Sequence, residues 1–143
     1  MPKATVTCNN FLALLYNATP WANIADNAGS SPITTISMRL ATASYAVGST
    51  GSTNEATYTN YALQTVARST AGWAAPATRA TSNAAQITFP QCGASGNTIT
   101  SACTSKASGA SDVFHYGDLN APITVSNLIQ PVFAIGAVTI TES

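Results

Sequence analysis

The only histidine of the chain, His115, lies in the stretch SDVFHYGDLNAPITV, with the acidic residues Asp112 and Asp118 close by. A histidine beside a carboxylate can be the base of a catalytic triad, provided that a nucleophile completes the set. Serines are abundant, but none stands in a G-x-S-x-G turn. Asp112 and Asp118 are also the only plausible carboxylate pair for an acid–base hydrolase.

The local pattern argues against both kinds of catalysis. Side chains alternate between the two faces of a strand, so His115 and Asp112 would project from opposite sides. Gly117 and Asp118 suit a turn, and we interpret the stretch as a strand, a glycine turn and the start of the next strand. His115 is then a half-buried polar residue with a backbone or hydroxyl partner. The sequence therefore predicts no enzyme and no catalytic residue.

The sequence also lacks the patterns that are typical of cofactor-binding and metal-binding sites. The chain has neither a G-x-x-x-x-G-K-[ST] phosphate loop nor a dinucleotide fingerprint. Its cysteines, Cys8, Cys92 and Cys103, are odd in number and lack the short paired spacing of zinc ligands. We predict that they are small buried residues. We predict no cofactor and no metal.

Two groups of aromatic residues are candidates for stacking on a sugar or a nucleic-acid base. Tyr58 and Tyr61 precede Arg68, and Trp73 precedes Arg79. Packing in a core or an interface is the competing interpretation, and we favour packing for each of these aromatics.

Ionisable side chains are scarce in this protein. Only 7% of its 143 residues are charged, and five basic residues balance five acidic ones; an average soluble domain has about 25%. Such a chain has no electrostatic field that would attract nucleic acid or an anionic membrane. The sequence also lacks the run of about 18 apolar residues that is needed to span a bilayer. Low net charge promotes association, and interface cores are depleted in Lys, Glu and Asp. We therefore expect partners to cover much of the surface, rather than a monomer solubilised by hydroxyls and amides.

The hydrophobic pattern predicts an all-β chain with a short N-terminal helix. Residues 4–15 fit an amphipathic helix capped by Asn9 or Asn10. Residues 33–47 alternate with period two, which indicates a half-buried strand. Roughly seven or eight short strands, separated by turns, are typical of an antiparallel β-sandwich or jelly roll. We divide the chain into an N-terminal arm or short helix, residues 1–20, and a single β-sandwich domain, residues 21–143.

The last predicted strand is the clearest. In residues 132–141 both alternating sets of side chains are apolar until Thr139, so we expect a central strand, between layers or beneath a partner. Other strands are expected within residues 57–69, 85–90, 97–107 and 112–119.

Several segments carry a resemblance to a known family. Ala80–Pro90, which contains ATSNAAQITFP, Val113–Leu119 and Ile123–Thr141 resemble successive strands of small tailed-phage virion proteins, which are often labelled tail fibre proteins. Upstream, NNFLALLYNAT, ISMRLATA and TNYALQTVA are similar to the opening helix and two early strands of that family. The sequence departs from the family pattern at Leu63, where arginine is common, and at Ser126–Pro131, which replaces an N-x-G-D turn.

The resemblance implies a structural component of a phage particle, made in the bacterial cytoplasm. We expect a capsid decoration or cement protein on the outside of the head, acting as a homotrimer bound to the major capsid protein. This location is favoured because fibre proteins are usually long and repetitive, whereas this chain is short. The alternative is a tail or fibre-base component with a role in adsorption or host-glycan binding.

Contact surfaces with such partners are expected in the N-terminal segment, residues 2–16, and in residues 128–133. Apolar side chains there would act as anchors, and two arginines would pair with acids of a partner. A place in the core of the chain itself is an equally open alternative for each of them. The candidate interface residues are Phe11, Leu12, Leu15, Trp21, Arg39, Arg68, Leu128, Ile129 and Phe133.

Overall fold

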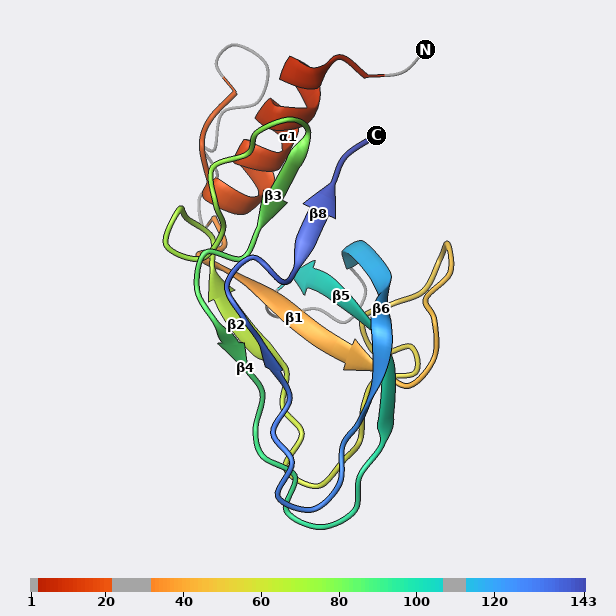
Figure 1. The fold of residues 1–143 in the computed structure, drawn as a ribbon. Coiled ribbons are helices and arrows are strands. Elements are labelled where there is room, and N and C mark those ends of the chain that lie inside the picture. Colours follow the sequence, from red (N-terminus) through yellow and green to blue (C-terminus); the bar gives the residue numbers. More distant parts are fainter. Residues whose placement is uncertain (1–2, 22–31, 107–112) are drawn as a thin grey trace. The chain divides into compact units, whose positions relative to one another are not determined.

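A computed structural model describes residues 3–21, 32–106 and 113–143. It confirms an antiparallel all-β fold with one short helix near the N-terminus (Figure 1). The elements, in chain order, are α1 Thr5–Asn17, β1 Thr35–Ala41, β2 Gln64–Ala67, β3 Ala80–Ser82, β4 Ile87–Thr88, β5 Thr98–Lys106, β6 Val113–Thr124, β7 Val132–Phe133 and β8 Thr139–Thr141.

Contacts within the chain define two compact units, each built from separate segments. Unit 1 comprises Met1–Thr35, Val66–Ile87 and Phe133–Ser143, and unit 2 comprises Ile36–Thr65 and Thr88–Val132. The chain therefore passes from one unit to the other four times. The predicted domain boundary at residue 20 stays a prediction.

Helix α1 belongs to unit 1 and has one buried face. Cys8, Leu12 and Tyr16 recur every four residues and are fully buried, as the helical period requires. The predicted cap is wrong, because Ala4 is the N-cap and Asn9 and Asn10 lie inside the helix. The Asn9 side chain instead accepts a hydrogen bond from the backbone N–H of Arg79, at 2.7 Å.

Asn83 organises the C-terminal part of unit 1. Strand β3 pairs with β8 in antiparallel register, with Thr81 opposite Ile140. The buried Asn83 side chain follows β3; its Nδ2 donates to the carbonyls of Ala85 and Ala134, each at 2.8 Å. Its Oδ1 accepts the N–H of Val138 at 2.9 Å.

The single strand predicted for residues 132–141 is therefore wrong. It is split into β7 and β8 by a turn in which the N–H of Ala137 bonds to the carbonyl of Ala134. Gly136 takes a positive φ of 77° there, a conformation that glycine adopts without strain. Asn83 provides hydrogen-bond partners for this turn that a neighbouring strand would otherwise supply. The segment is not covered on both faces either, since Ile135 is exposed.

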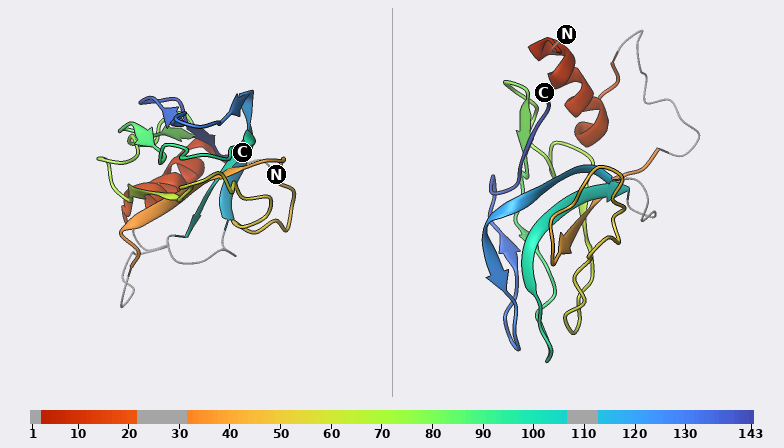
Figure 2. Two further views of the ribbon diagram at one scale, coloured as in Figure 1. Left: turned by 90° about the horizontal axis from the view of Figure 1, so that it is seen from below. Right: turned by 90° about the vertical axis from the view of Figure 1, so that its right-hand side faces the viewer.

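Strands β1 and β5 form the centre of a four-stranded sheet with the order β2-β1-β5-β6. Strands β1 and β5 pair antiparallel, with Arg39 opposite Cys103, and β5 and β6 run side by side in Figure 2. The prediction of a half-buried β1 is wrong, because every residue from Ile36 to Ala41 is buried. Both faces of this strand are covered.

Different groups cover the two faces of β1 within unit 2. On the face of Ala41 and Cys103, the side chain of Tyr45 completes a small apolar cluster. Near Leu40, the ring of Tyr61 stacks on that of Phe89 with centroids 6.2 Å apart, and its hydroxyl accepts the N–H of Leu40. Loops that follow β1 and β4 thus complete the core.

The interpretation of the histidine stretch as a strand followed by a glycine turn is wrong, because strand β6 continues through it. Strand β6 runs from Val113 to Thr124 without a glycine turn at Gly117. The register against β5 shifts instead, since Ser101 pairs with Asp118 but Ile99 pairs with Ile123. The extra residues on β6 form a bulge, and a bulge depends on the partner strand, so the pattern of one strand does not predict it.

We expect Gly96→Ala to destabilise unit 2 by about 2–3 kcal/mol, as overpacked sites do. A Cβ atom at Gly96 would lie 1.7 Å from the carbonyl oxygen of Val125, so the backbone must shift to admit it. Chemical unfolding followed by circular dichroism measures the change. Gly117→Ala is the matched control, because a Cβ there meets nothing within 4 Å. Equal stability of the two variants would contradict the close approach at Gly96.

Candidate functional site

The histidine stretch does not bring together a catalytic set among the described residues. His115 and Asp118 are three positions apart on β6 and therefore project from opposite faces of the sheet. The backbone carbonyl of His115 accepts a hydrogen bond from the Thr104 hydroxyl at 3.5 Å. Asp112, the other member of the predicted carboxylate pair, lies outside the described residues. Within the described ranges, no three His, Cys, Asp or Glu side chains gather where they could hold a metal ion.

The aromatic candidates for sugar stacking are packed inside the protein. Trp73 is fully buried and meets the ring of Tyr16 edge-on at 4.8 Å. Tyr58 is buried too, with its ring 5.3 Å from that of Tyr61 and its hydroxyl donating to the carbonyl of Pro90. The packing interpretation is confirmed for these residues. The three cysteines are also buried and free, as predicted.

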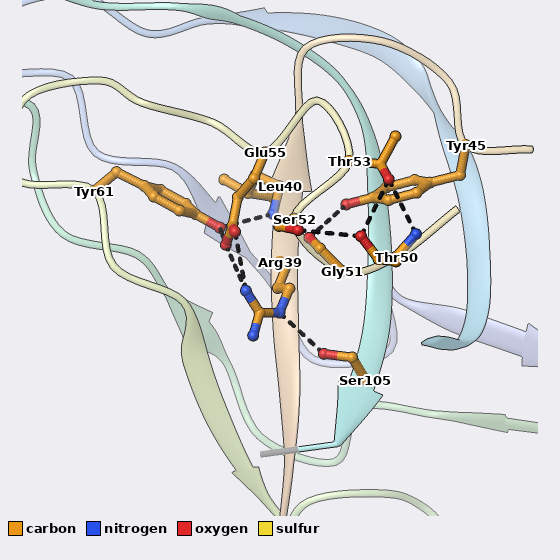
Figure 3. Close-up of polar contacts among 10 residues, drawn as sticks. All are labelled: Arg39, Leu40, Tyr45, Thr50, Gly51, Ser52, Thr53, Glu55, Tyr61 and Ser105. Atoms are coloured by element: carbon orange, nitrogen blue, oxygen red, sulfur yellow. Dashed lines mark hydrogen bonds and ion pairs between the residues drawn. The ribbon is translucent and has the colours of Figure 1, made fainter. Parts of the chain in front are cut away.

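The most elaborate polar cluster of unit 2 is the Arg39 network, formed by Arg39, Glu55, Tyr61 and Ser105 (Figure 3). Nη1 of Arg39 lies 2.9 Å from each carboxylate oxygen of Glu55, and its Nε donates to the Ser105 hydroxyl at 3.0 Å. The Tyr61 hydroxyl donates to Glu55 Oε1 at 3.0 Å. The Arg39 and Glu55 side chains are only 8% and 20% exposed.

This network fastens the loop after β1 back onto the strand. Glu55 also forms a backbone bridge with Ala41, and the N–H of Ala56 donates to the carbonyl of Leu40. Since Glu55 already satisfies the charge of Arg39, the network has a structural role within unit 2. A contact of Arg39 with an acid of a partner stays a prediction.

Buried tyrosines make unit 2 sensitive to alkali. Burial raises the pKa of Tyr58 to about 12. Burial also raises the pKa of Tyr45 and of Tyr61; for Tyr61, the hydrogen bond with the N–H of Leu40 opposes the rise and nearby Glu55 adds to it. All three phenols therefore stay protonated in the folded protein when those of an unfolded chain ionise near pH 10.

We expect the stability of unit 2 to fall above about pH 9, because the Cys103 thiol, whose pKa burial also raises, and then the buried tyrosines ionise more readily in the unfolded chain. The pKa values of the folded state are raised, so stability is lost as the pH rises from the unfolded pKa through the folded ones. Each such tyrosine contributes a slope of at most about 1.4 kcal/mol per pH unit. Urea unfolding at a series of pH values measures it. Tyr58→Phe should lessen the slope; a stability that stays flat to about pH 11 would argue against these shifts.

Four of the nine predicted interface side chains serve the interior of the chain. Leu12 and Phe133 are buried, and Arg39 is held in its network. Arg68 donates from Nε to the carbonyl of Leu15 at 2.7 Å and from Nη2 to that of Leu14 at 2.5 Å. It thus supplies positive charge at the carboxyl end of α1, which has no basic residue of its own in its last turn. Burial lowers the pKa of its guanidinium.

The other predicted interface residues retain exposed surface. Leu15 and Trp21 are partly buried, whereas Phe11, Leu128 and Ile129 are 41%, 66% and 43% exposed. Their part in an interface stays a prediction. Glu55 was not singled out from the sequence, although it is the one acidic residue between Asp26 and Asp112.

Leu128 and Ile129 belong to an exposed turn, Ser126–Ile129, which we call the apolar turn. The N–H of Ile129 closes it on the carbonyl of Ser126 at 2.9 Å. Leu128 has a positive φ of 69°. Residues 91 and 92 hold the turn from one side: the N–H of Leu128 donates to the carbonyl of Cys92, and Nε2 of Gln91 donates to the carbonyl of Leu128, both at 2.8 Å.

Comparison with known proteins finds one family. No curated protein matches the chain. In the described part of the chain, no helix combines the length and apolar character needed to cross a membrane. Residues 14–141 match the family described as podophage GP4 fiber I protein gp80, which indicates a structural role in a phage virion. Because this match spans well over half of the chain, the protein belongs to the gp80 fiber I protein family.

Proposed function

We propose that this protein is a structural subunit of a phage tail fibre that takes part in adsorption to the host. The supporting observation is the family match, which extends from residue 14 to residue 141 and carries the description of a fiber protein. Nearly all of this short chain therefore corresponds to sequence found in a fibre protein. The small size of the chain, which favoured capsid decoration, no longer argues against a fibre.

Capsid decoration is the second candidate, and the composition favours it. A neutral chain with 7% charged residues suits a subunit that is covered by neighbours, such as a trimer bound to the major capsid protein. The same property suits a subunit packed within a fibre. The number of copies in the particle separates the two locations.

We expect purified virions to contain this protein in numbers on the order of tens, as the symmetry of a tail appendage allows. A decoration protein that occupies repeated positions on the head would reach numbers on the order of hundreds. Densitometry of virion proteins against the major capsid protein, with immunogold labelling to locate the subunit, measures this. Labelling on the head at high copy number would replace the fibre proposal with the decoration proposal, and absence from the virion would exclude both.

A further inference from the structure

The apolar turn places a leucine where the backbone disfavours it. Leu128 is the third residue of the turn and has a positive φ of 69°. With the hydrogen bond from the N–H of Ile129 to the carbonyl of Ser126, this is the position of a turn that normally takes glycine or asparagine. The side chain of a leucine there is strained, because its Cβ approaches the neighbouring carbonyl group.

The strained leucine is also displayed to solvent in a fixed position. Its side chain is 66% exposed and that of Ile129 is 43% exposed. The hydrogen bonds to Cys92 and Gln91 hold the backbone on both sides of Leu128, and the N–H of Cys92 donates to the carbonyl of Ile129 at 2.9 Å. Leu128 is unfavourable here for two reasons, its backbone conformation and its exposed apolar side chain. A contact with a partner would bury the side chain and offset both costs.

The charge distribution indicates which partner fits. No acidic or basic residue occurs from Leu119 to Thr141. In the described part of unit 2, Arg39 and Glu55 neutralise each other, and only Lys106 and Asp118 of the acidic and basic residues are exposed. An apolar surface without ions is complementary to the same surface of another copy, and copies of a chain with zero net charge do not repel each other.

We propose that the apolar turn binds a second copy of this chain, with Leu128 as the side chain that fills the contact. The proposal deepens the proposed function, since a subunit of a fibre needs a surface for its neighbour, and it rests on that function only for its biological setting. It does not require a particular location in the virion.

Sedimentation velocity of the purified chain over a wide concentration range tests the contact, with Leu128→Asn as the variant. We expect the wild type to self-associate, and the variant to need about tenfold more protein for the same degree of association. Asparagine accepts a positive φ, so the unfolding midpoint of the variant should rise in the most dilute samples. If wild-type subunits associate too tightly to dissociate on dilution, the exchange of subunits between amine-labelled copies measures the contact instead. This exchange should be about tenfold faster in the variant.

Val47→Asn is the matched control, because Val47 is 96% exposed in the same unit and lies in a different loop. It should leave association unchanged. A wild type that stays monomeric up to about 1 mM would overturn the proposal. So would a Leu128→Asn variant that associates like the wild type or has a lower unfolding midpoint. In that case the fibre assignment would still stand, since the copy number in virions tests it separately.

Discussion

Arg39→Met is expected to lower the stability of unit 2 by about 3 kcal/mol, near the lower end of the range for breaking a buried ion pair. The variant removes both contacts to the Glu55 carboxylate and leaves that charge without its cation. Glu55 keeps 20% of its side chain exposed, so water can hydrate part of the abandoned charge and limit the loss. Urea unfolding measures the free energy, and hydrogen exchange of β1 and β5 amides localises it.

A double variant separates the charge effect from lost packing. Arg39→Met combined with Glu55→Met removes both charges, and replacing a buried pair with apolar groups is often close to neutral. We therefore expect it to be more stable than Arg39→Met alone. Asp118→Asn, which removes a charge from an exposed site of the same unit, should change stability by less than about 0.5 kcal/mol. An effect of Arg39→Met no larger than this would mean that the Arg39 network contributes little.

Asn83→Leu is expected to cost unit 1 about 3 kcal/mol, because it removes three part-buried hydrogen bonds that contribute about 1 kcal/mol each. The backbone partners in these bonds are the carbonyls of Ala85 and Ala134 and the N–H of Val138. Leucine has a similar volume, so the loss reports hydrogen bonding more than packing. The turn before β8 should open, which hydrogen exchange at Gly136 and Val138 would detect.

Asn17→Ala is the control for this effect in the same unit. Its side chain donates a hydrogen bond from Nδ2 to the carbonyl of Trp73 at 2.9 Å. We expect a cost of about 1 kcal/mol for this variant. Similar losses in the two variants would show that Asn83 does not hold the turn as its contacts indicate.

The sequence predicted the fold where local patterns decide the structure. Period-two alternation located β1 and β5, and the helical spacing of Cys8, Leu12 and Tyr16 fits α1. The prediction failed where distant residues decide. The break between β7 and β8 depends on Asn83, about fifty residues earlier in the chain, and the course of β6 depends on a bulge against β5.

The same difference between local and distant residues applies to the candidate site. The sequence leaves an exposed turn at Ser126–Pro131 in doubt, because Leu128 and Ile129 are typical contact residues, whereas the structure shows both side chains exposed. The sequence leaves Arg39 equally open to an acid of a partner and to a place in the core of the chain. Its counterion, Glu55, is 16 residues away and reaches it only after the chain folds back from β1. The strain at Leu128 is a backbone property, which a sequence pattern does not show.

The four passages of the chain between unit 1 and unit 2 limit how this protein can be cut, shortened or recombined. Neither unit is a continuous stretch, so no single gene fragment encodes one of them whole. Removing residues from either terminus would damage unit 1 while leaving unit 2 attached to its remains. A chimaeric protein that exchanges either unit therefore requires four internal splice points, one at each passage between the units.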